Sequence, residues 1–167
     1  MTAVRAGIIT VSTKGAAGER ADESGPAMRE SLVAAGHDVV SASLVTDDVA
    51  KVANAILDAV RAGANLVLTS GGTGLSPNDV TPEATRRVID REVPGIAEAL
   101  RARSLAKTPH GMLSRGVAGA VGGTLVVNLP GSPRAVRESL EVLLPVVPHA
   151  LELLAGDSGE SGHRPKA

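Results

Sequence analysis

Short apolar runs alternate along the chain with longer segments in which apolar residues recur at helical spacing. The apolar runs predict four strands, over residues 4–11, 39–45, 66–70 and 124–129. The helical spacing predicts helices over residues 26–35, 49–60, 82–91, 94–107 and 133–154. Pro145 and Pro148 should divide the last of these helices after about residue 144, because proline lacks the N–H that helical hydrogen bonding requires.

This alternation is typical of a parallel sheet that is covered by helices on both faces. It predicts an α/β fold, a three-layer α/β/α sandwich with a mostly parallel central sheet, in which residues 1–155 form one domain. Residues 156–167 are polar and glycine-rich, and we expect them to be disordered. Ligands of such sheets bind beyond the carboxyl ends of the strands. We expect four loops to meet there: 10–25, 46–48, 70–79 and 130–132.

The composition narrows the possible classes of function. The chain has 167 residues, a net charge of −1 and no Cys, Phe, Tyr or Trp. Disulfides and thiolate metal sites are therefore excluded, and the small net charge argues against nucleic-acid or membrane binding. A nucleobase or pterin would have to be held by aliphatic contacts and hydrogen bonds. The start of the chain has no secretory pattern and no apolar run approaches the ~20 residues that cross a bilayer, so we expect a soluble, cytoplasmic protein.

The most informative segment is TSGGTGLSPNDVTPEA, residues 69–84, in which a buried strand leads into a glycine-rich turn and then a helix. Glycines let backbone N–H groups approach an anion closely and adopt positive φ at little cost. The turn is therefore a candidate nucleotide and phosphate site, formed by Ser70, Gly71, Gly72, Thr73 and Gly74.

One acidic residue, Asp79, lies between this turn and the next helix, for which we expect Thr81 as the N-cap and Pro82 as the first helical residue. A carboxylate would repel phosphate unless a cation lay between them, so a Mg²⁺ ion bridging Asp79 and the phosphates is a reasonable hypothesis. The alternative is that the glycines only make a turn and Asp79 only helps to cap the helix.

A second acidic residue, Asp47, follows the strand that ends at residue 45. It should reach the same rim of the sheet as Asp79, and two carboxylates there would suit a divalent cation on a nucleotide. The alternative is that Asp47 is the N-cap of the helix that follows it. The four histidines have no spacing that suggests a metal site.

Other polar or flexible residues near the strand ends could contact a ligand. They are Ser12, Asp22, Ser24, Ser114, Pro130, Gly131 and Ser132. Loop 10–25 also carries Lys14 and Arg20, and suits a mobile segment that offers hydrogen bonds and positive charge, with an ordinary solvated loop as the alternative. Ser132 could simply cap the next helix, and Arg115 could contact an anion or form a surface ion pair.

Several segments, in order, resemble one protein family: LVTDD, TSGGTGLSPNDVTPEAT, MLSRGVAG, NLPGSPRAV and LLPVVPHALELL. From about Arg5 to Leu154 the chain is similar to the molybdopterin adenylyltransferase family, which includes MogA, MoaB and the gephyrin G domain. The resemblance implies an α/β/α domain, usually a homotrimer, that uses ATP and Mg²⁺ to adenylylate molybdopterin and release pyrophosphate. A molybdenum-insertion protein is a further partner that it implies.

The resemblance makes Asp47 and Asp79 the catalytic residues and the Mg²⁺ ligands, and it places the nucleotide phosphates on the glycine-rich turn. The polar residues near the other strand ends become weaker candidates for substrate contacts. Many family members have arginine immediately before the second aspartate, where this chain has Asn78, which can hydrogen-bond phosphate but cannot neutralise it. We expect this difference to affect rate or affinity more than the class of reaction.

Two other functions fit part of the sequence. One is a molybdopterin-binding or scaffolding module of the same fold without catalysis, although binding alone would not need both aspartates. The other is a generic nucleotide-binding α/β domain, which would explain the glycine-rich turn but not the other segments.

Overall fold

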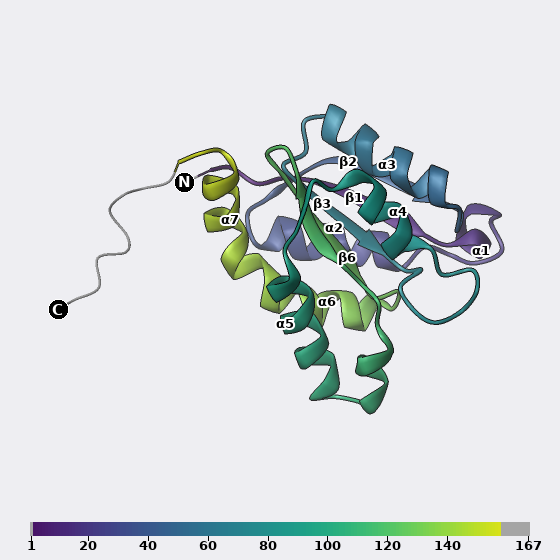
Figure 1. Cartoon of the computed structure of the whole chain (residues 1–167). Coiled ribbons are helices and arrows are strands. Elements are labelled where there is room, and N and C mark those ends of the chain that lie inside the picture. The colour runs from purple at the N-terminus through teal and green to yellow at the C-terminus, as the bar shows by residue number, and fades with distance from the viewer. Residues whose placement is uncertain (1, 158–167) are drawn as a thin grey trace.

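In the computed structural model, which describes residues 2–157, one six-stranded sheet is covered by helices on both faces (Figure 1). Its strands are β1 (Arg5–Val11), β2 (Asp38–Val45), β3 (Leu66–Ser70), β4 (Arg91–Glu92), β5 (Ala118–Val121) and β6 (Thr124–Leu129), in the order β2-β1-β3-β6-β5-β4. Strand β1 pairs in parallel with β2 and β3, and β3 pairs in parallel with β6. Strand β5 pairs antiparallel with both β6 and β4. The predicted mostly parallel sheet is confirmed.

The α-helices and two 3₁₀ turns connect these strands. They are α1 (Thr13–Ala16), α2 (Ser24–Ala34), α3 (Val49–Arg61), α4 (Thr81–Val88), α5 (Pro94–Leu105), η1 (Pro109–Leu113), α6 (Pro133–Leu143), η2 (Leu144–Val146) and α7 (Val147–Leu154). The predicted interruption by Pro145 and Pro148 is confirmed, because η2 separates α6 from α7. No helix within residues 2–157 combines the length and the apolar character that a membrane span requires.

Two apolar clusters, one on each face of the sheet, make the three layers. Successive strand residues point to opposite faces, so Ile8 belongs to the cluster that includes residues of α2, α5, α6 and α7, whereas Ile9 belongs to the cluster that includes residues of α3 and α4. The same alternation separates Leu66 and Leu68 from Val67. All of these strand side chains are buried, which explains why the central strands β1 and β3 carry nearly continuous apolar runs in sequence.

The pattern of apolar residues missed β4, β5, α1 and η1. Strand β4 has only two residues and β5 reads AGAV, so neither has the β-branched run that identifies a strand. The helix predicted over residues 82–91 is also too long, since α4 ends at Val88 and Arg91 pairs with Ala120 in the sheet. Disorder was predicted for residues 156–167, of which residues 158–167 lie outside the described part of the chain.

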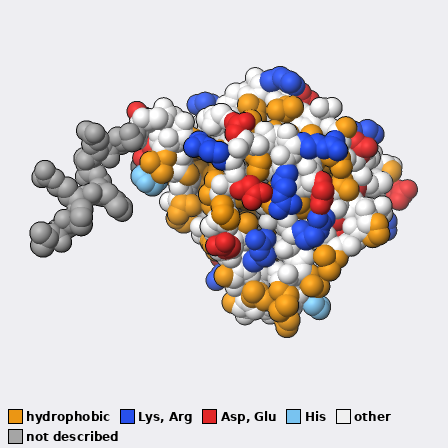
Figure 2. Space-filling view, in the orientation of Figure 1, with side chains coloured by type: hydrophobic (Ala, Val, Ile, Leu, Met, Phe, Trp, Pro, Cys, Tyr) orange, Lys and Arg blue, Asp and Glu red, His pale blue; other side chains and the backbone are white. Residues whose placement is uncertain are grey.

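The surface shown in Figure 2 has two different parts. Basic and acidic side chains are interleaved over its middle, whereas apolar side chains gather at the lower end, where α5 leads into η1 (Figures 1 and 2). The exposed apolar residues in these two elements are Leu105, Met112 and Leu113. We call these three residues the apolar tip.

Candidate active site

The carboxyl ends of the four parallel strands border a cavity of about 1110 Å³. Residues from all four loops that follow these strands line it, as the geometry of a parallel sheet requires. The lining consists of residues 10–15, 20–24, 70–72 and 131–133 with Leu44, Asp47, Ser76, Asn78 and Asp79. Both aspartates singled out from the sequence are therefore on one cavity.

The glycine-rich turn has a backbone that only glycine adopts easily. Gly71 has φ of +96° and Gly72 has φ of +68°. A Cβ on Gly71 would overlap the carbonyl oxygen of Val11, and a Cβ on Gly72 would overlap Oγ1 of Thr81. The turn is thus pressed against neighbouring segments, with Gly71 and Gly72 exposing backbone to the cavity.

Thr81 does not act as the predicted N-cap. It is the first residue of α4, the N-cap is Val80, and Pro82 therefore follows one position into the helix. The Thr81 side chain is buried and its Oγ1 donates a hydrogen bond of 2.9 Å to the Gly71 carbonyl oxygen. The Thr81 hydroxyl group therefore binds the glycine-rich turn and does not cap the helix, because the turn folds back onto the start of α4.

Asp47 is not the N-cap of the following helix. That position belongs to Asp48, whose Oδ1 accepts a hydrogen bond of 2.9 Å from the Lys51 backbone N–H. Asp47 turns toward α1 instead, and its Oδ2 accepts hydrogen bonds from the backbone N–H and the Oγ1 hydroxyl of Thr13, at 3.0 and 2.8 Å. The capping alternative for Asp47 is therefore wrong.

Asp79 is held within its own loop. Its Oδ2 accepts a hydrogen bond of 3.1 Å from the Ser76 N–H, and its backbone N–H donates one of 2.9 Å to the Ser76 carbonyl oxygen. A Cβ on Gly74 would lie 2.8 Å from Asp79 Oδ2, and a Cβ on Gly72 would lie 3.2 Å from Asp47 Oδ1. The turn therefore contacts one aspartate on each side.

The residues present fit a magnesium ion. Oδ2 of Asp47 accepts hydrogen bonds from Thr13, and Oδ2 of Asp79 accepts one from Ser76. Oδ1 of each aspartate has no hydrogen-bond partner within residues 2–157. The same residues contain no cluster of three or more acidic or histidine side chains that could hold a metal ion by themselves. Mg²⁺ is commonly held by one or two carboxylates, with water and substrate phosphates as the other ligands. Two carboxylates with one free oxygen each match that arrangement.

Several other predicted residues hold the walls of the cavity. Ser12 caps α1 by accepting a bond of 3.0 Å from the Gly15 N–H, so part of the predicted loop 10–25 is helical. Asp22 accepts hydrogen bonds from the Thr10 hydroxyl group and from the Gly25 N–H. All three polar residues predicted in this segment, including Ser24, line the cavity.

The turn after β6 is bound to the neighbouring loops. Ser24 Oγ donates a hydrogen bond of 2.7 Å to the Gly131 carbonyl oxygen, and Ser70 Oγ donates one of 3.2 Å to the Pro130 carbonyl oxygen. Ser132 caps α6, as predicted, by accepting a bond from the Ala135 N–H. These contacts bring the first, third and fourth loops together.

Four of the predicted residues do not line the main cavity. Pro130 and Ser114 border a separate, small cavity, while Thr73 and Gly74 line neither of these two cavities. Lys14 and Arg20, which the sequence suggested only as a source of positive charge in loop 10–25, do line the main cavity. Their position in a long polar loop after a strand was the only sequence signal. They supply positive charge to a site in which Asn78 replaces an arginine.

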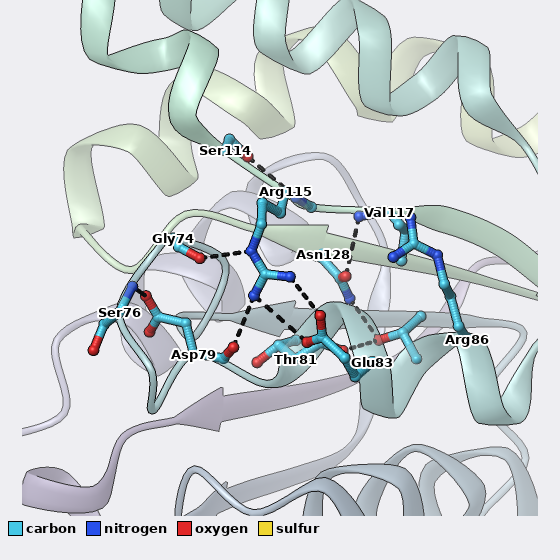
Figure 3. Close-up of polar contacts among 12 residues, drawn as sticks. Gly74, Ser76, Asp79, Thr81, Glu83, Arg86, Ser114, Arg115, Val117 and Asn128 are labelled. Atoms are coloured by element: carbon cyan, nitrogen blue, oxygen red, sulfur yellow. Dashed lines mark hydrogen bonds and ion pairs between the residues drawn. The ribbon is translucent and has the colours of Figure 1, made fainter.

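Arg115 binds the glycine-rich segment itself (Figure 3). Its Nε donates a hydrogen bond of 2.8 Å to the Gly74 carbonyl oxygen, its Nη2 donates one of 2.8 Å to the Asp79 carbonyl oxygen, and its guanidinium pairs with Glu83. The hydrogen bond from Arg115 is the main reason that the pKa of Glu83 lies below its ordinary value of 4.5, while partial burial opposes this shift.

Comparisons with known proteins agree with this geometry. Residues 7–149 match a protein family described as a probable molybdopterin binding domain. The chain is 39% identical over 151 residues to the molybdopterin adenylyltransferase of Pyrococcus furiosus, covering 87% of this chain and 88% of that protein. It is 54% identical to the molybdopterin biosynthesis enzyme MoaB of Thermus thermophilus, with a TM-score of 0.85 over 92% of this chain and 97% of that structure.

Some relatives are much longer than this chain. It is 40% identical over 156 residues to the molybdenum cofactor biosynthesis bifunctional protein of Synechococcus elongatus, which covers 93% of this chain but only 49% of that protein. The chain therefore spans about half the length of that curated relative.

Proposed function

Because this chain belongs to the family of probable molybdopterin binding domains, we propose that it is a molybdopterin adenylyltransferase of molybdenum cofactor biosynthesis. It transfers AMP from ATP to the phosphate of molybdopterin in a Mg²⁺-dependent reaction and releases pyrophosphate. One observation carries this proposal: Asp47 and Asp79 line the same cavity as the glycine-rich turn, and each has one carboxylate oxygen without a hydrogen-bond partner among residues 2–157.

The proposed reaction needs no protein nucleophile. A phosphate oxygen of molybdopterin attacks the α-phosphorus of ATP, and the bond from that phosphorus to the oxygen of the leaving pyrophosphate breaks. Such reactions depend on in-line positioning and on neutralisation of phosphate charge. The absence of cysteine is consistent with this chemistry.

The residues around the cavity fit distinct roles in that reaction. Asp47 and Asp79 would hold Mg²⁺, which supplies positive charge to the ATP phosphates. The backbone at Gly71 and Gly72 approaches the phosphates without a side chain between them. Lys14 and Arg20 add charge that Asn78 cannot supply.

The other predicted polar residues contribute to binding or to the walls. Ser12, Asp22, Ser24 and Ser132 orient loops at the rim and offer oxygen atoms to molybdopterin. Ser114 and Pro130 act from outside the cavity, through the segments that they support. The pterin is held by backbone groups and aliphatic side chains, since the chain has no aromatic residue.

Pyrophosphate release from ATP, measured with purified protein and verified molybdopterin, tests the proposal. We expect release to require both molybdopterin and Mg²⁺. Asp79→Asn and Asp47→Asn should each lower the rate by about 100-fold or more, because loss of a metal ligand costs several kcal/mol of transition-state stabilisation. Each asparagine keeps an oxygen that can accept the hydrogen bonds that Oδ2 of the aspartate accepts. The circular dichroism spectrum and the melting temperature should therefore change little.

Asp48→Asn is the matched control. Asp48 is adjacent to Asp47 and does not line the cavity, and asparagine caps helices as well as aspartate does. This variant should retain activity within about threefold. Full activity of Asp79→Asn, or no pyrophosphate from the wild type, would contradict the proposed enzyme. A non-catalytic binding or scaffolding module would bind molybdopterin in a titration but show no conversion that depends on ATP.

Assembly and location are part of the same proposal. We propose a cytoplasmic homotrimer that passes its product to a molybdenum-insertion protein. The apolar tip supports association with another protein surface, because apolar side chains that gather in one exposed patch are a common feature of interaction sites.

A further inference from the structure

Arg115 binds both ends of the loop formed by residues 73–79, although this loop lies far from Arg115 in the sequence. It follows η1, and its guanidinium reaches the carbonyl oxygens of Gly74 and Asp79, which lie 41 and 36 residues earlier (Figure 3). The Arg115 backbone N–H also donates a hydrogen bond of 2.8 Å to the Thr73 carbonyl oxygen. One residue therefore fixes the beginning and the end of the segment 73–79.

The guanidinium of Arg115 has little capacity left for a substrate anion. Of its five N–H groups, Nε binds Gly74, the two on Nη2 bind Asp79 and Glu83, and one on Nη1 binds Glu83. Within residues 2–157 only one N–H of Nη1 remains. Glu83 also neutralises the charge, so the anion contact considered for Arg115 from the sequence does not fit this geometry.

The two carbonyl groups that Arg115 binds flank the carboxylate of Asp79. One belongs to Asp79 itself, and the other belongs to Gly74, whose Cα faces Asp79 Oδ2. Inside the loop, the Asp79 carboxylate is held only by the Ser76 N–H among the described residues. Movement of either loop end would therefore move the Asp79 side chain at the cavity.

We propose that Arg115 is a positioning residue, which presents Asp79 to the cavity by clamping both ends of loop 73–79. The role in catalysis rests on the proposed function, whereas the clamp itself does not. Planarity matters here more than charge, because a lysine ammonium cannot span two carbonyl groups and a carboxylate in the way that the flat fork of arginine does.

Two variants separate geometry from charge. Arg115→Ala removes the clamp and the charge, and Arg115→Lys removes the clamp but keeps the charge. Both should lower kcat/KM by roughly 10- to 100-fold, as is typical when a residue that orients a metal ligand is lost. The Mg²⁺ concentration for half-maximal activity should rise in both, while the KM for molybdopterin changes less.

Hydrogen exchange of the protein without substrates tests the clamp independently of activity. Amides of residues 73–79 should exchange faster in both variants than in the wild type, while β3 and β6 keep their protection. Arg86→Ala is the matched control, since it removes a surface arginine that pairs with Glu92 and does not touch the loop. It should leave both the exchange of the loop and kcat/KM unchanged.

The outcomes distinguish the two proposals. Recovery of activity by Arg115→Lys would show that charge matters, and unchanged exchange of loop 73–79 in Arg115→Ala would show that the clamp does not exist; either result overturns the inference. If the wild type makes no pyrophosphate but the loop exchange rises as expected, the proposed function fails and the clamp stands. If Arg115→Ala does not fold, the exchange of Arg115→Lys decides.

Discussion

Asp47 and Asp79 line the same cavity, but the protein holds them in different ways. Asp47 lies in a short connection and is fixed by one residue, Thr13, which is 34 positions away in the sequence. Asp79 is fixed by its own loop, through Ser76, and that loop is in turn tied down by Arg115. The Asp47 carboxylate therefore depends on docking between two loops, whereas the Asp79 carboxylate depends on the conformation of a single loop.

The largest effect should come from substitution of Gly72, the residue of the glycine-rich turn that lies beside Asp47. In Gly72→Ala a side chain at φ of +68° would overlap Thr81 Oγ1 and crowd Asp47 Oδ1. We expect about 2 to 4 kcal/mol less unfolding free energy, from backbone strain and the disturbed hydrogen bond between Thr81 and Gly71. Urea denaturation measures this loss, and pyrophosphate release should fall with it.

Gly123→Ala is the control for that substitution. Gly123 does not have a positive φ, and a Cβ there would meet no atom within 4 Å beyond its chain neighbours. Gly123→Ala lowers the conformational entropy of the unfolded chain as Gly72→Ala does, so the two variants differ mainly in the folded state. Its stability should stay within about 0.5 kcal/mol of the wild type. Equal stability of the two alanine variants would contradict the crowding described for Gly72.

A smaller effect should follow from loosening Asp47 alone. Thr13→Val removes the hydroxyl group that donates to Asp47 Oδ2 and accepts from the Asp47 backbone N–H, but it keeps the backbone N–H that donates to Oδ2. Only the first of the two lost bonds orients the carboxylate, and a bond of this kind is worth about 0.5 to 1.5 kcal/mol, so kcat/KM should fall roughly 2- to 10-fold. Thr13→Ser keeps the hydroxyl group and should restore activity. If serine and valine behave alike, Thr13 does not orient Asp47.

The smallest effect should be a dependence of stability on pH through Glu83. Its pKa in the folded protein is lowered below 4.5, so its ionised form contributes stability above about pH 4.5 and loses that contribution as the pH falls through the lowered pKa. The side chains of Glu83 and Arg115 are 45% and 33% exposed, so the contribution should be under about 1 kcal/mol.

Urea denaturation of the wild type and Glu83→Gln over a range of pH tests this contribution. The wild type should be more stable by a constant amount between about pH 6 and 8, and the difference should shrink on acidification below about pH 4.5. A difference that grows on acidification would have the wrong sign.

Much of the fold could be predicted because long periodic segments encode it. The four parallel strands, the three-layer architecture and the division at Pro145 and Pro148 are confirmed, and so is the family resemblance. Strands β4 and β5 could not be predicted, because two residues and a run of small residues carry no periodic signal. They form because β6 offers an edge with which β5 can pair.

The candidate site was predictable in its parts but not in its contacts. Sequence reasoning selected Asp47, Asp79 and the glycine-rich turn, which the structure brings to one cavity. It considered only Asp47 as the cap of α3 and missed Asp48, because both are good capping residues and adjacent positions look alike in sequence. It left Arg115 undecided between an anion contact and an ion pair, because its carbonyl partners have no side-chain signature in the sequence.

Apolar periodicity and ordered motifs are local properties of the chain, so the four parallel strands, the helices that cover them and the family could be read from the sequence. The contacts that hold the two aspartate loops became visible only in the folded molecule. They are hydrogen bonds that Thr13 makes to the Asp47 carboxylate and Arg115 makes to the Asp79 carbonyl oxygen, each across more than 30 residues. Such bonds form only after the loops at the strand ends have been brought together by the packing of the sheet.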